Sequence, residues 1–221
     1  MAKDVILFGI GDFARVASVY LEQDSPHKVV GFTVHEAFRT TETLLGKPVT
    51  PFEKMLTEYP PHQVNMFVAM GFRKLNKARA EIYQACKALG YTLITYVNSK
   101  ASLWGEVEMG DNVFVFENNV VQPFVKIGCD TILWSGNHLG HDSVIGSHCF
   151  ITSQAVISGN VTIGDHCFIG VNATIRDGIT IGAESVIGAG SLILSDAAPF
   201  SVFQGTATEV SRVPSHRLRG L

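Results

Sequence analysis

An unbroken series of aliphatic residues at every sixth position constrains the fold of this chain more than any other feature. The fifteen members of the series are Met109, Val115, Val121, Ile127, Leu133, Leu139, Ile145, Ile151, Ile157, Ile163, Ile169, Ile175, Ile181, Ile187 and Ile193. The position four residues further on is mostly small, as in Val113, Val125, Thr131, Ser143, Cys149, Ala155, Val161, Cys167, Ala173 and Ser185. An aliphatic residue followed by glycine also recurs every eighteen residues, at 109, 127, 145, 163 and 181. So many matches in one register indicate a repeat architecture.

The six-residue period has a direct structural interpretation. Six residues make one short strand and one turn, and three such sides close a triangular coil of eighteen residues. Equivalent residues of neighbouring coils stack about 4.8 Å apart, the spacing of paired strands, so the aliphatic positions should point inward. An α-helix is excluded, because a period of six matches neither 3.6 nor 3.5 residues per turn. The repeats resemble the left-handed parallel β-helix of hexapeptide acyltransferases, about five coils long, and the handedness comes from that resemblance.

The residues before the repeat predict a different kind of domain. We expect strands at 4–8, 27–34, 65–71 and 92–98, a glycine turn followed by a helix within 9–23, and helices at 51–59 and 73–89. Strands that alternate with helices indicate a small, parallel, Rossmann-like α/β sheet. The predicted organisation is therefore an α/β domain over residues 1–100, a β-helix over 101–196, and a C-terminal cap or arm over 197–221, where the period is lost.

Composition narrows the class of protein. The chain is 46% hydrophobic and 17% charged, and its net charge of −3 gives no electrostatic reason to expect nucleic acid binding. We see no signal-peptide pattern and no apolar run of transmembrane length, so we expect a cytoplasmic protein without membrane insertion. The four cysteines show no CxxC spacing and are expected to be free thiols.

The turn after the first predicted strand is a candidate anion site. Gly9 and Gly11 precede a helix, where main-chain N–H groups can bind a phosphate or a ribose. They form the first half of a GxGxxG pattern, and Ala14 stands at the third position, which accepts alanine. The second predicted strand runs into Val34 and His35 rather than an acidic residue, which argues against an NAD site. A cradle for a nucleotide sugar is favoured, and a purely structural turn is the alternative.

The middle of the repeat contains the best catalytic candidates. His141 and Asp142 follow the inward Leu139 by two and three positions, so they fall near a corner where side chains can face outward. Histidine is the side chain that most readily exchanges a proton near neutral pH. A neighbouring carboxylate could bond Nδ1 and leave Nε2 free to act as a base. A solvated corner without a function is the alternative.

A metal site is not favoured. His148 and His166 are eighteen residues apart and should stack on one side of the coils. Left-handed β-helices that bind zinc, such as the γ-class carbonic anhydrases, use a histidine pair five residues apart, and no two histidines here have that spacing. We therefore expect surface histidines and no metal requirement.

These features together resemble the NeuD/PglD-type nucleotide-sugar acyltransferases, in particular their UDP-bacillosamine and GDP-perosamine N-acetyltransferases. The similarity spans nearly the whole chain and is most specific in residues 140–146 (GHDSVIG), 158–175 (SGNVTIGDHCFIGVNATI) and 186–191 (VIGAGS). The resemblance implies a homotrimer that uses acetyl-CoA. It implies that His141 is the general base, that Asp142 orients it, and that the main chain of Gly159 and Ala189 contacts CoA.

The predicted function follows from this resemblance. We expect an acetyl-CoA-dependent N-acetyltransferase for a nucleotide-linked amino-deoxy sugar, with a 4-amino-4,6-dideoxyhexose as first choice, in O-antigen or surface polysaccharide biosynthesis. The predicted substrate-binding residues are Gly9, Gly11, Asp12, Phe13 and His138. The chain departs from the family at Phe13 and Phe150, where histidines are usual. The alternatives are a sugar O-acetyltransferase of the sialic acid type and a non-catalytic nucleotide-sugar-binding protein.

Overall fold

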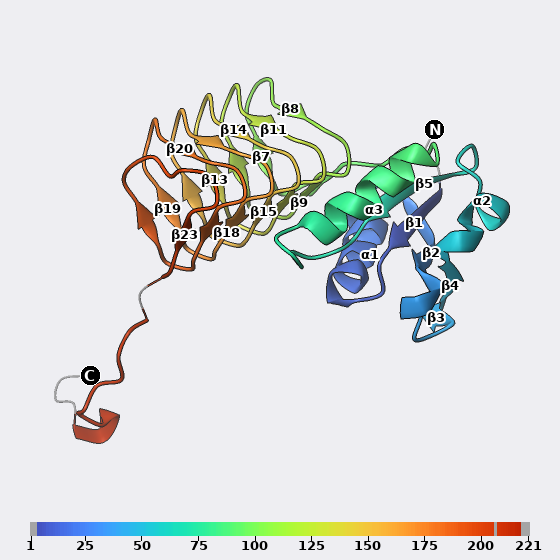
Figure 1. The fold of residues 1–221 in the computed structure, drawn as a ribbon, viewed down its shortest axis with the longest axis horizontal. Coiled ribbons are helices and arrows are strands. Elements are labelled where there is room, and N and C mark those ends of the chain that lie inside the picture. The colour runs from blue at the N-terminus through green and yellow to red at the C-terminus, as the bar shows by residue number, and fades with distance from the viewer. Residues whose placement is uncertain (1–3, 206, 218–221) are drawn as a thin grey trace.

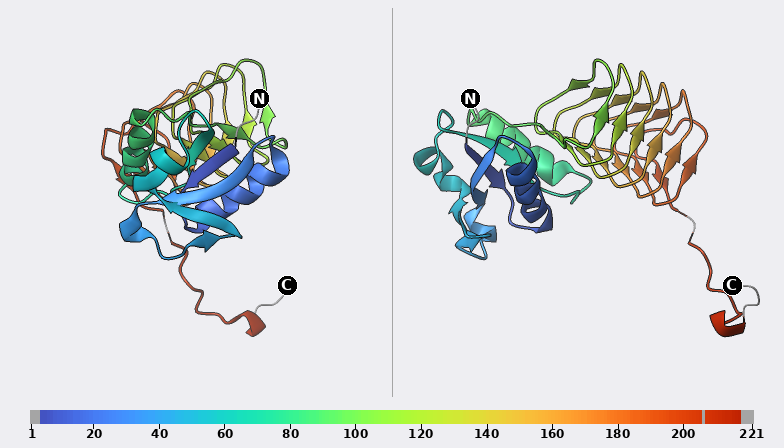
Figure 2. Two further views of the ribbon diagram at one scale, coloured as in Figure 1. Left: turned by 90° about the vertical axis from the view of Figure 1, so that its right-hand side faces the viewer. Right: turned by 180° about the vertical axis from the view of Figure 1, so that it is seen from behind.

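The computed structural model describes residues 4–205 and 207–217. A small α/β domain is followed by a long parallel β-helix and an extended C-terminal arm that contains η3 (Ser215–Arg217) (Figure 1). The further views show the β-helix as a stack of coils that projects from the α/β domain, with the arm leaving its far end (Figure 2). Within the described part of the chain, no helix has the length and apolar character needed to cross a membrane.

The α/β domain is built on a five-stranded sheet with the order β3-β4-β2-β1-β5. Its strands are β1 (Asp4–Phe8), β2 (Lys28–Val34), β3 (Thr43–Leu44), β4 (Lys47–Pro51) and β5 (Val64–Val68). Its helices are α1 (Asp12–Asp24), η1 (Glu36–Phe38), η2 (Phe52–Lys54), α2 (Met55–Glu58) and α3 (Lys77–Ala88). The central strands pair in parallel, whereas β3 is antiparallel to β4. The predicted Rossmann-like sheet is confirmed, with the short β3–β4 hairpin as an addition.

Two predicted elements of this domain differ in the structure. The helix expected from residue 73 begins only at Lys77, because Lys74, Leu75 and Asn76 all have positive φ angles, which an α-helix cannot contain. The strand expected at 92–98 does not join the α/β sheet as a strand. Only Leu93 makes an isolated bridge to β5, and the following residues leave the domain to start the β-helix.

Three parallel ladders of two-residue strands form the sides of the β-helix. The β6 face contains β6 (Tyr96–Val97), β9 (Phe114–Val115), β12 (Ile132–Leu133), β15 (Phe150–Ile151), β18 (Phe168–Ile169), β21 (Val186–Ile187) and β23 (Val202–Phe203). The β7 face contains β7 (Ser102–Leu103), β10 (Val120–Val121), β13 (His138–Leu139), β16 (Val156–Ile157), β19 (Thr174–Ile175) and β22 (Leu192–Ile193). The β8 face contains β8 (Glu108–Met109), β11 (Lys126–Ile127), β14 (Val144–Ile145), β17 (Thr162–Ile163) and β20 (Thr180–Ile181). Strand pairing in the β-helix thus starts before the first predicted repeat, at β6, and ends after the last, at β23. The division into domains at 1–100, 101–196 and 197–221 remains a prediction.

The aliphatic ladder fills the interior of these coils. Each strand pairs with its equivalent eighteen residues away, so that Ile163, for example, stacks between Ile145 and Ile181. From Val115 to Ile193, the side chain at every sixth position is at most 3% exposed. Burial of one such side chain stabilises the fold by about 1.5–3 kcal/mol. The small residues four positions later are buried as well, including the free thiols of Cys149 and Cys167. The inward ladder is therefore confirmed.

At each corner of the coils, one residue adopts the left-handed conformation, and it lies three positions after an inward aliphatic residue. The non-glycine residues with positive φ at this position are Asn112, Asn118, Phe124, Asp130, Asp142, His148, Gln154, Asn160, His166, Asn172 and Glu184. Asn and Asp are the non-glycine residues that best tolerate this conformation, which explains their frequency here. Phe124 departs from this chemistry, because it is bulky and its side chain remains 62% exposed.

The α/β domain packs on the first coils of the β6 face through aromatic side chains. The ring of Phe13, in the first turn of α1, lies 5.7 Å from that of Phe114 and 6.0 Å from that of Trp134. Trp134 in turn stacks on Phe116 at 4.5 Å. Aromatic pairs at such separations each contribute about 0.5–1.5 kcal/mol beyond their buried area. The two domains therefore share one apolar core at their junction.

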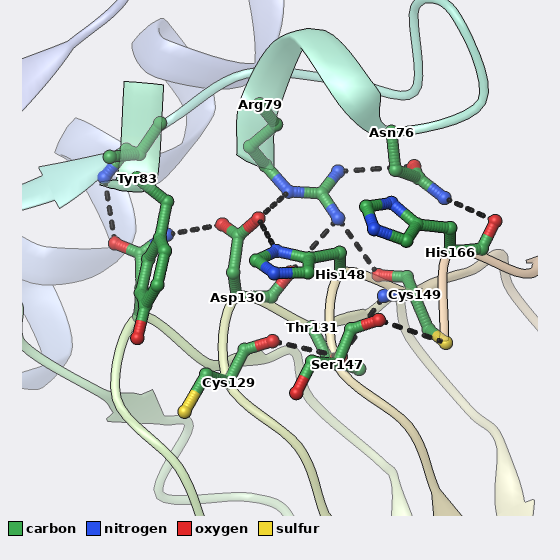
Figure 3. Close-up of polar contacts among 12 residues, drawn as sticks. Asn76, Arg79, Tyr83, Cys129, Asp130, Thr131, Ser147, His148, Cys149 and His166 are labelled. Atoms are coloured by element: carbon green, nitrogen blue, oxygen red, sulfur yellow. Dashed lines mark hydrogen bonds and ion pairs between the residues drawn. The ribbon is translucent and has the colours of Figure 1, made fainter. Parts of the chain in front are cut away.

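A buried polar network ties α3 to the β-helix (Figure 3). Arg79 Nε lies 3.1 Å from Asp130 Oδ2, and both side chains are fully buried. The guanidinium also donates from Nη2 to the carbonyl oxygens of Asp130 (2.9 Å) and Cys149 (3.1 Å). Asn76 at the N-terminus of α3 donates from Nδ2 to the carbonyl oxygen of Cys167 (3.1 Å). Because these acceptors belong to three successive coils, α3 fixes the α/β domain along the stack.

Candidate active site

His141 and Asp142 lie at the corner between β13 and β14, where the chain passes from the β7 face to the β8 face. Their side chains are 53% and 52% exposed, and His141 Nδ1 lies 2.9 Å from Asp142 Oδ2. Asp142 is the left-handed residue of this corner, with φ of 58°. An ionised carboxylate can only accept a hydrogen bond, so Nδ1 carries the proton and Nε2 is left as the basic nitrogen. The pair thus has the geometry of an oriented general base.

Gly159 forms the surface beneath the imidazole of His141. It occupies the same corner in the following coil, and the N–H of Asn160 beside it donates to the carbonyl oxygen of His141 at 2.8 Å. A Cβ atom built on Gly159 would lie only 2.7 Å from His141 Nε2. Nε2 of His141 can therefore occupy this position only because residue 159 has no side chain. Sequence resemblance alone related Gly159 to CoA, whereas the structure places it under the candidate base.

His138 projects from a face of the β-helix rather than from the corner. It lies on β13 and pairs in register with Val120 and Val156 of the neighbouring strands. The side chain is half-buried, and no hydrogen bond joins it to His141 among residues 4–205 and 207–217. Its predicted contact with substrate stays a prediction.

Ala189 lies at a different corner from His141 and Gly159. It falls between β21 and β22, where the chain passes from the β6 face to the β7 face. Two residues predicted to contact the same CoA molecule are therefore on different edges of one subunit. A single subunit does not bring them to one corner.

The glycine turn after β1 is accessible at its second glycine. Gly9 is buried, has φ of 129° and packs against the carbonyl of Ala69, so it is needed for close approach of β1 and β5. Gly11 and Asp12 are exposed at the N-terminus of α1, where no side chain caps the helix. The first main-chain N–H groups of a helix lack intrahelical partners, so this terminus can bind an anion. The side chain of Phe13 is buried in the domain junction, and its predicted role in substrate binding has no accessible side chain to support it.

His148 and His166 are not the surface histidines that the sequence suggested. Their rings stack with centroids 4.8 Å apart under α3, and His148 Nδ1 lies 2.8 Å from Asp130 Oδ2 (Figure 3). Burial and the neighbouring His148 lower the pKa of His166. The prediction of surface histidines was wrong because α3 covers this corner, and the repeat gives no sign of that.

Among the described residues, no group of three or more His, Cys, Asp or Glu side chains is arranged to hold a metal ion. That the protein requires no metal stays a prediction.

Comparison with known proteins agrees with this architecture. Residues 124–159 match the family model for the bacterial transferase hexapeptide (six repeats), and residues 160–195 match the hexapeptide repeat of succinyl-transferase. The acetyltransferase domain of PglB from Neisseria gonorrhoeae is 25% identical, with a TM-score of 0.77, over 88% of this chain and 93% of that domain. Residues 124–195 therefore contain hexapeptide repeats, and the chain shares the fold of this acetyltransferase domain over most of its length. The expected left-handed β-helix and the family resemblance are thereby confirmed.

Two further solved structures share this fold. PerB from Caulobacter crescentus, in complex with CoA and GDP-perosamine, is 24% identical with a TM-score of 0.80, over 91% of this chain and 94% of that one. WeeI from Acinetobacter baumannii is 19% identical with a TM-score of 0.79, over 92% of this chain and 97% of that one. At these identities the likeness concerns the fold, which extends over both domains.

Proposed function

We propose that this protein is an acetyl-CoA-dependent N-acetyltransferase that modifies the amino group of a nucleotide-linked amino-deoxy sugar, with a 4-amino-4,6-dideoxyhexose as the first candidate. The observation that carries the proposal is the His141–Asp142 pair at an exposed corner, with Nε2 lying over Gly159. Support also comes from the solved structures, because the related PglB domain is described as an acetyltransferase domain and PerB was solved with CoA and GDP-perosamine.

His141 acts as the general base in the proposed reaction. The amine nitrogen of the sugar attacks the thioester carbonyl carbon, and His141 Nε2 takes the proton that the nitrogen loses as the C–N bond forms. The C–S bond then breaks, and the sulfur of CoA leaves with a proton from the imidazolium. Asp142 keeps its negative charge and holds Nδ1–H throughout. General base catalysis of this kind contributes about 10²–10⁴-fold, and positioning of the two substrates supplies much of the rest.

The donor site is proposed along the corner that contains Gly159. Main-chain N–H groups near this glycine would stabilise the negative charge that develops on the carbonyl oxygen. The PglB domain has also been solved in complex with acetyl-CoA. These observations support acetyl-CoA as the co-substrate.

We propose a homotrimer because one subunit does not complete this donor site. Gly159 lies at the corner between the β7 and β8 faces, and Ala189 lies at the corner between the β6 and β7 faces. Packing of β-helices side by side would bring the first corner of one subunit next to the second corner of its neighbour. Sedimentation that shows a stable monomer at micromolar concentration would contradict this assembly.

The nucleotide is proposed to bind at the N-terminus of α1. Gly11 and Asp12 are exposed there, and the helix dipole favours a diphosphate at this end.

We further propose a cytoplasmic location, since the cysteines are free thiols, as is usual in a reducing compartment.

The test is acetyl transfer to a defined set of acceptors, followed as release of free thiol from acetyl-CoA. The set contains UDP-, dTDP- and GDP-linked 4-amino-4,6-dideoxyhexoses and the matching sugars with a hydroxyl in place of the amine. Turnover with an amino sugar supports the proposal. Turnover only with hydroxyl sugars would indicate an O-acetyltransferase, and binding without turnover would indicate a non-catalytic protein.

A further inference from the structure

The main chain at His141 is held by a side chain from the preceding coil. The N–H of His141 donates a hydrogen bond to Oε1 of Gln122 at 2.9 Å. Gln122 follows β10 directly and lies at the same corner as His141, nineteen residues earlier in the chain. Because the donor is a main-chain N–H, the acceptor must be the carboxamide oxygen, which fixes the orientation of the Gln122 amide.

One main-chain hydrogen bond joins this corner to the preceding coil. The carbonyl oxygen of Pro123 accepts it from the N–H of Asp142 at 3.2 Å. Gln122 adds a second and shorter bond, so that two successive N–H groups of the corner are held by the coil below. Without it, the N–H of His141 would have only water as a partner.

The bond from Gln122 completes the restraint of the imidazole. Asp142 fixes the ring through Nδ1, and Gly159 supports its face. Neither contact holds the main-chain N–H of His141, and the hydrogen bond to Oε1 does. A misplacement of about 1 Å in a catalytic group can reduce the rate by about 10²-fold.

We propose that Gln122 is a positioning residue for His141, an inference that rests on the proposed function of this site. Gln122 acts through the main chain of the base. Its loss should therefore lower kcat and leave the KM values for donor and acceptor nearly unchanged.

The test compares Gln122→Met with Gln122→Glu in the full chain. Methionine has similar length but cannot accept this hydrogen bond, whereas glutamate keeps an acceptor oxygen at the same place. With acetyl-CoA and the amino sugar that the wild type accepts, Gln122→Met should lose about 10–100-fold in kcat at the plateau of the pH–rate profile. Gln122→Glu should keep a kcat within about threefold of wild type. In both variants the KM values for acetyl-CoA and for the amino sugar should change less than about twofold, because Gln122 acts through the main chain of His141 and not on a substrate. Gln63→Met, at an exposed turn of the α/β domain just before β5, is the control and should keep full activity.

Hydrogen exchange gives a second measurement that does not depend on turnover. In mass spectrometry of the peptide that contains His141, Gln122→Met should exchange one additional amide faster than wild type, whereas Gln122→Glu and Gln63→Met should not. If the wild type transfers acetyl to no acceptor, the proposed function fails, and exchange still decides whether Gln122 holds His141. Unchanged exchange in Gln122→Met would overturn the inference. A rise in the KM for acceptor without a fall in kcat would also overturn it, since it would show that Gln122 contacts the sugar instead.

Discussion

The basic nitrogen of His141 lies directly over Gly159, so close that a Cβ atom on residue 159 would be 2.7 Å from Nε2. The φ angle of Gly159 is not in the left-handed region, and an alanine could adopt its conformation. The glycine is thus required by the histidine and not by the local backbone. This relationship couples two coils at the candidate active site.

Gly159→Ala should lower kcat by about tenfold or more, because the imidazole must leave its place over residue 159 and with it the bond to Asp142. The Tm should change little, since the ring can move toward solvent. Steady-state kinetics with acetyl-CoA and calorimetry check the two parts. Gly71→Ala is the control, because a Cβ there meets nothing within 4 Å. Full activity in Gly159→Ala would show that the observed ring position is not the catalytic one.

His141→Asn should lower kcat by about 10²–10⁴-fold, because asparagine cannot accept the proton. Asp142→Asn should have a smaller effect, since it removes only the group that orients the ring. His138→Asn should cost least, because His138 lies on a strand away from the corner. Rates of thiol release from the three variants test this order. An equal loss in His138→Asn and His141→Asn would mean that the base is assigned to the wrong histidine.

Ile163→Ala should destabilise the protein by about 2–5 kcal/mol, because Ile163 is 1% exposed between Ile145 and Ile181. Thr162 on the same strand points outward and is exposed, so Thr162→Ala should change stability by less than about 0.5 kcal/mol. Denaturant unfolding of both variants measures the difference. Equal effects would contradict the inward assignment of Ile163.

Phe124→Asn should stabilise the protein by up to about 1 kcal/mol, because asparagine tolerates the left-handed conformation that Phe124 adopts at φ of 66°. The loss of packing is small for a side chain that is 62% exposed. The reverse change, Asn118→Phe, occupies the same position of another corner and should destabilise by a similar amount. Thermal unfolding of the two variants should give shifts of opposite sign, and a lower Tm for Phe124→Asn would contradict the argument.

The stability of the wild type should fall as the pH drops below about 6.5, partly because of His166. Burial and His148 lower the pKa of His166 in the folded state, so the unfolded chain binds a proton more readily. The contribution of His166 is therefore fully present above the unfolded pKa and is lost as the pH falls toward the folded one. His166→Asn keeps a residue suited to φ of 59° and should flatten the decrease of Tm with pH. His62→Asn, which removes an exposed histidine, is the control; an identical pH profile in wild type and His166→Asn would refute this role.

The sequence was sufficient to predict the β-helix and its interior. A strand of two residues and a turn repeat every six residues, so the inward positions can be read directly from the chain. The same register placed His141 and Asp142 at an outward corner, and the pair is found there. The Asn and Asp residues at the corners follow the same local rule, since they are suited to the left-handed conformation.

Only the tertiary structure decided which corners are covered and which are open. His141 and His148 are both corner residues of the repeat, yet α3 largely covers the second and leaves the first exposed. Nothing in the sequence indicated the contact between Gln122 and His141, the position of Nε2 over Gly159, or the passage of the chain from Leu93 beside β5 into the β-helix. Each of these depends on how side chains from separate coils or domains pack together. A local period sets which way a residue points, but it carries no information about what other part of the chain will meet it there.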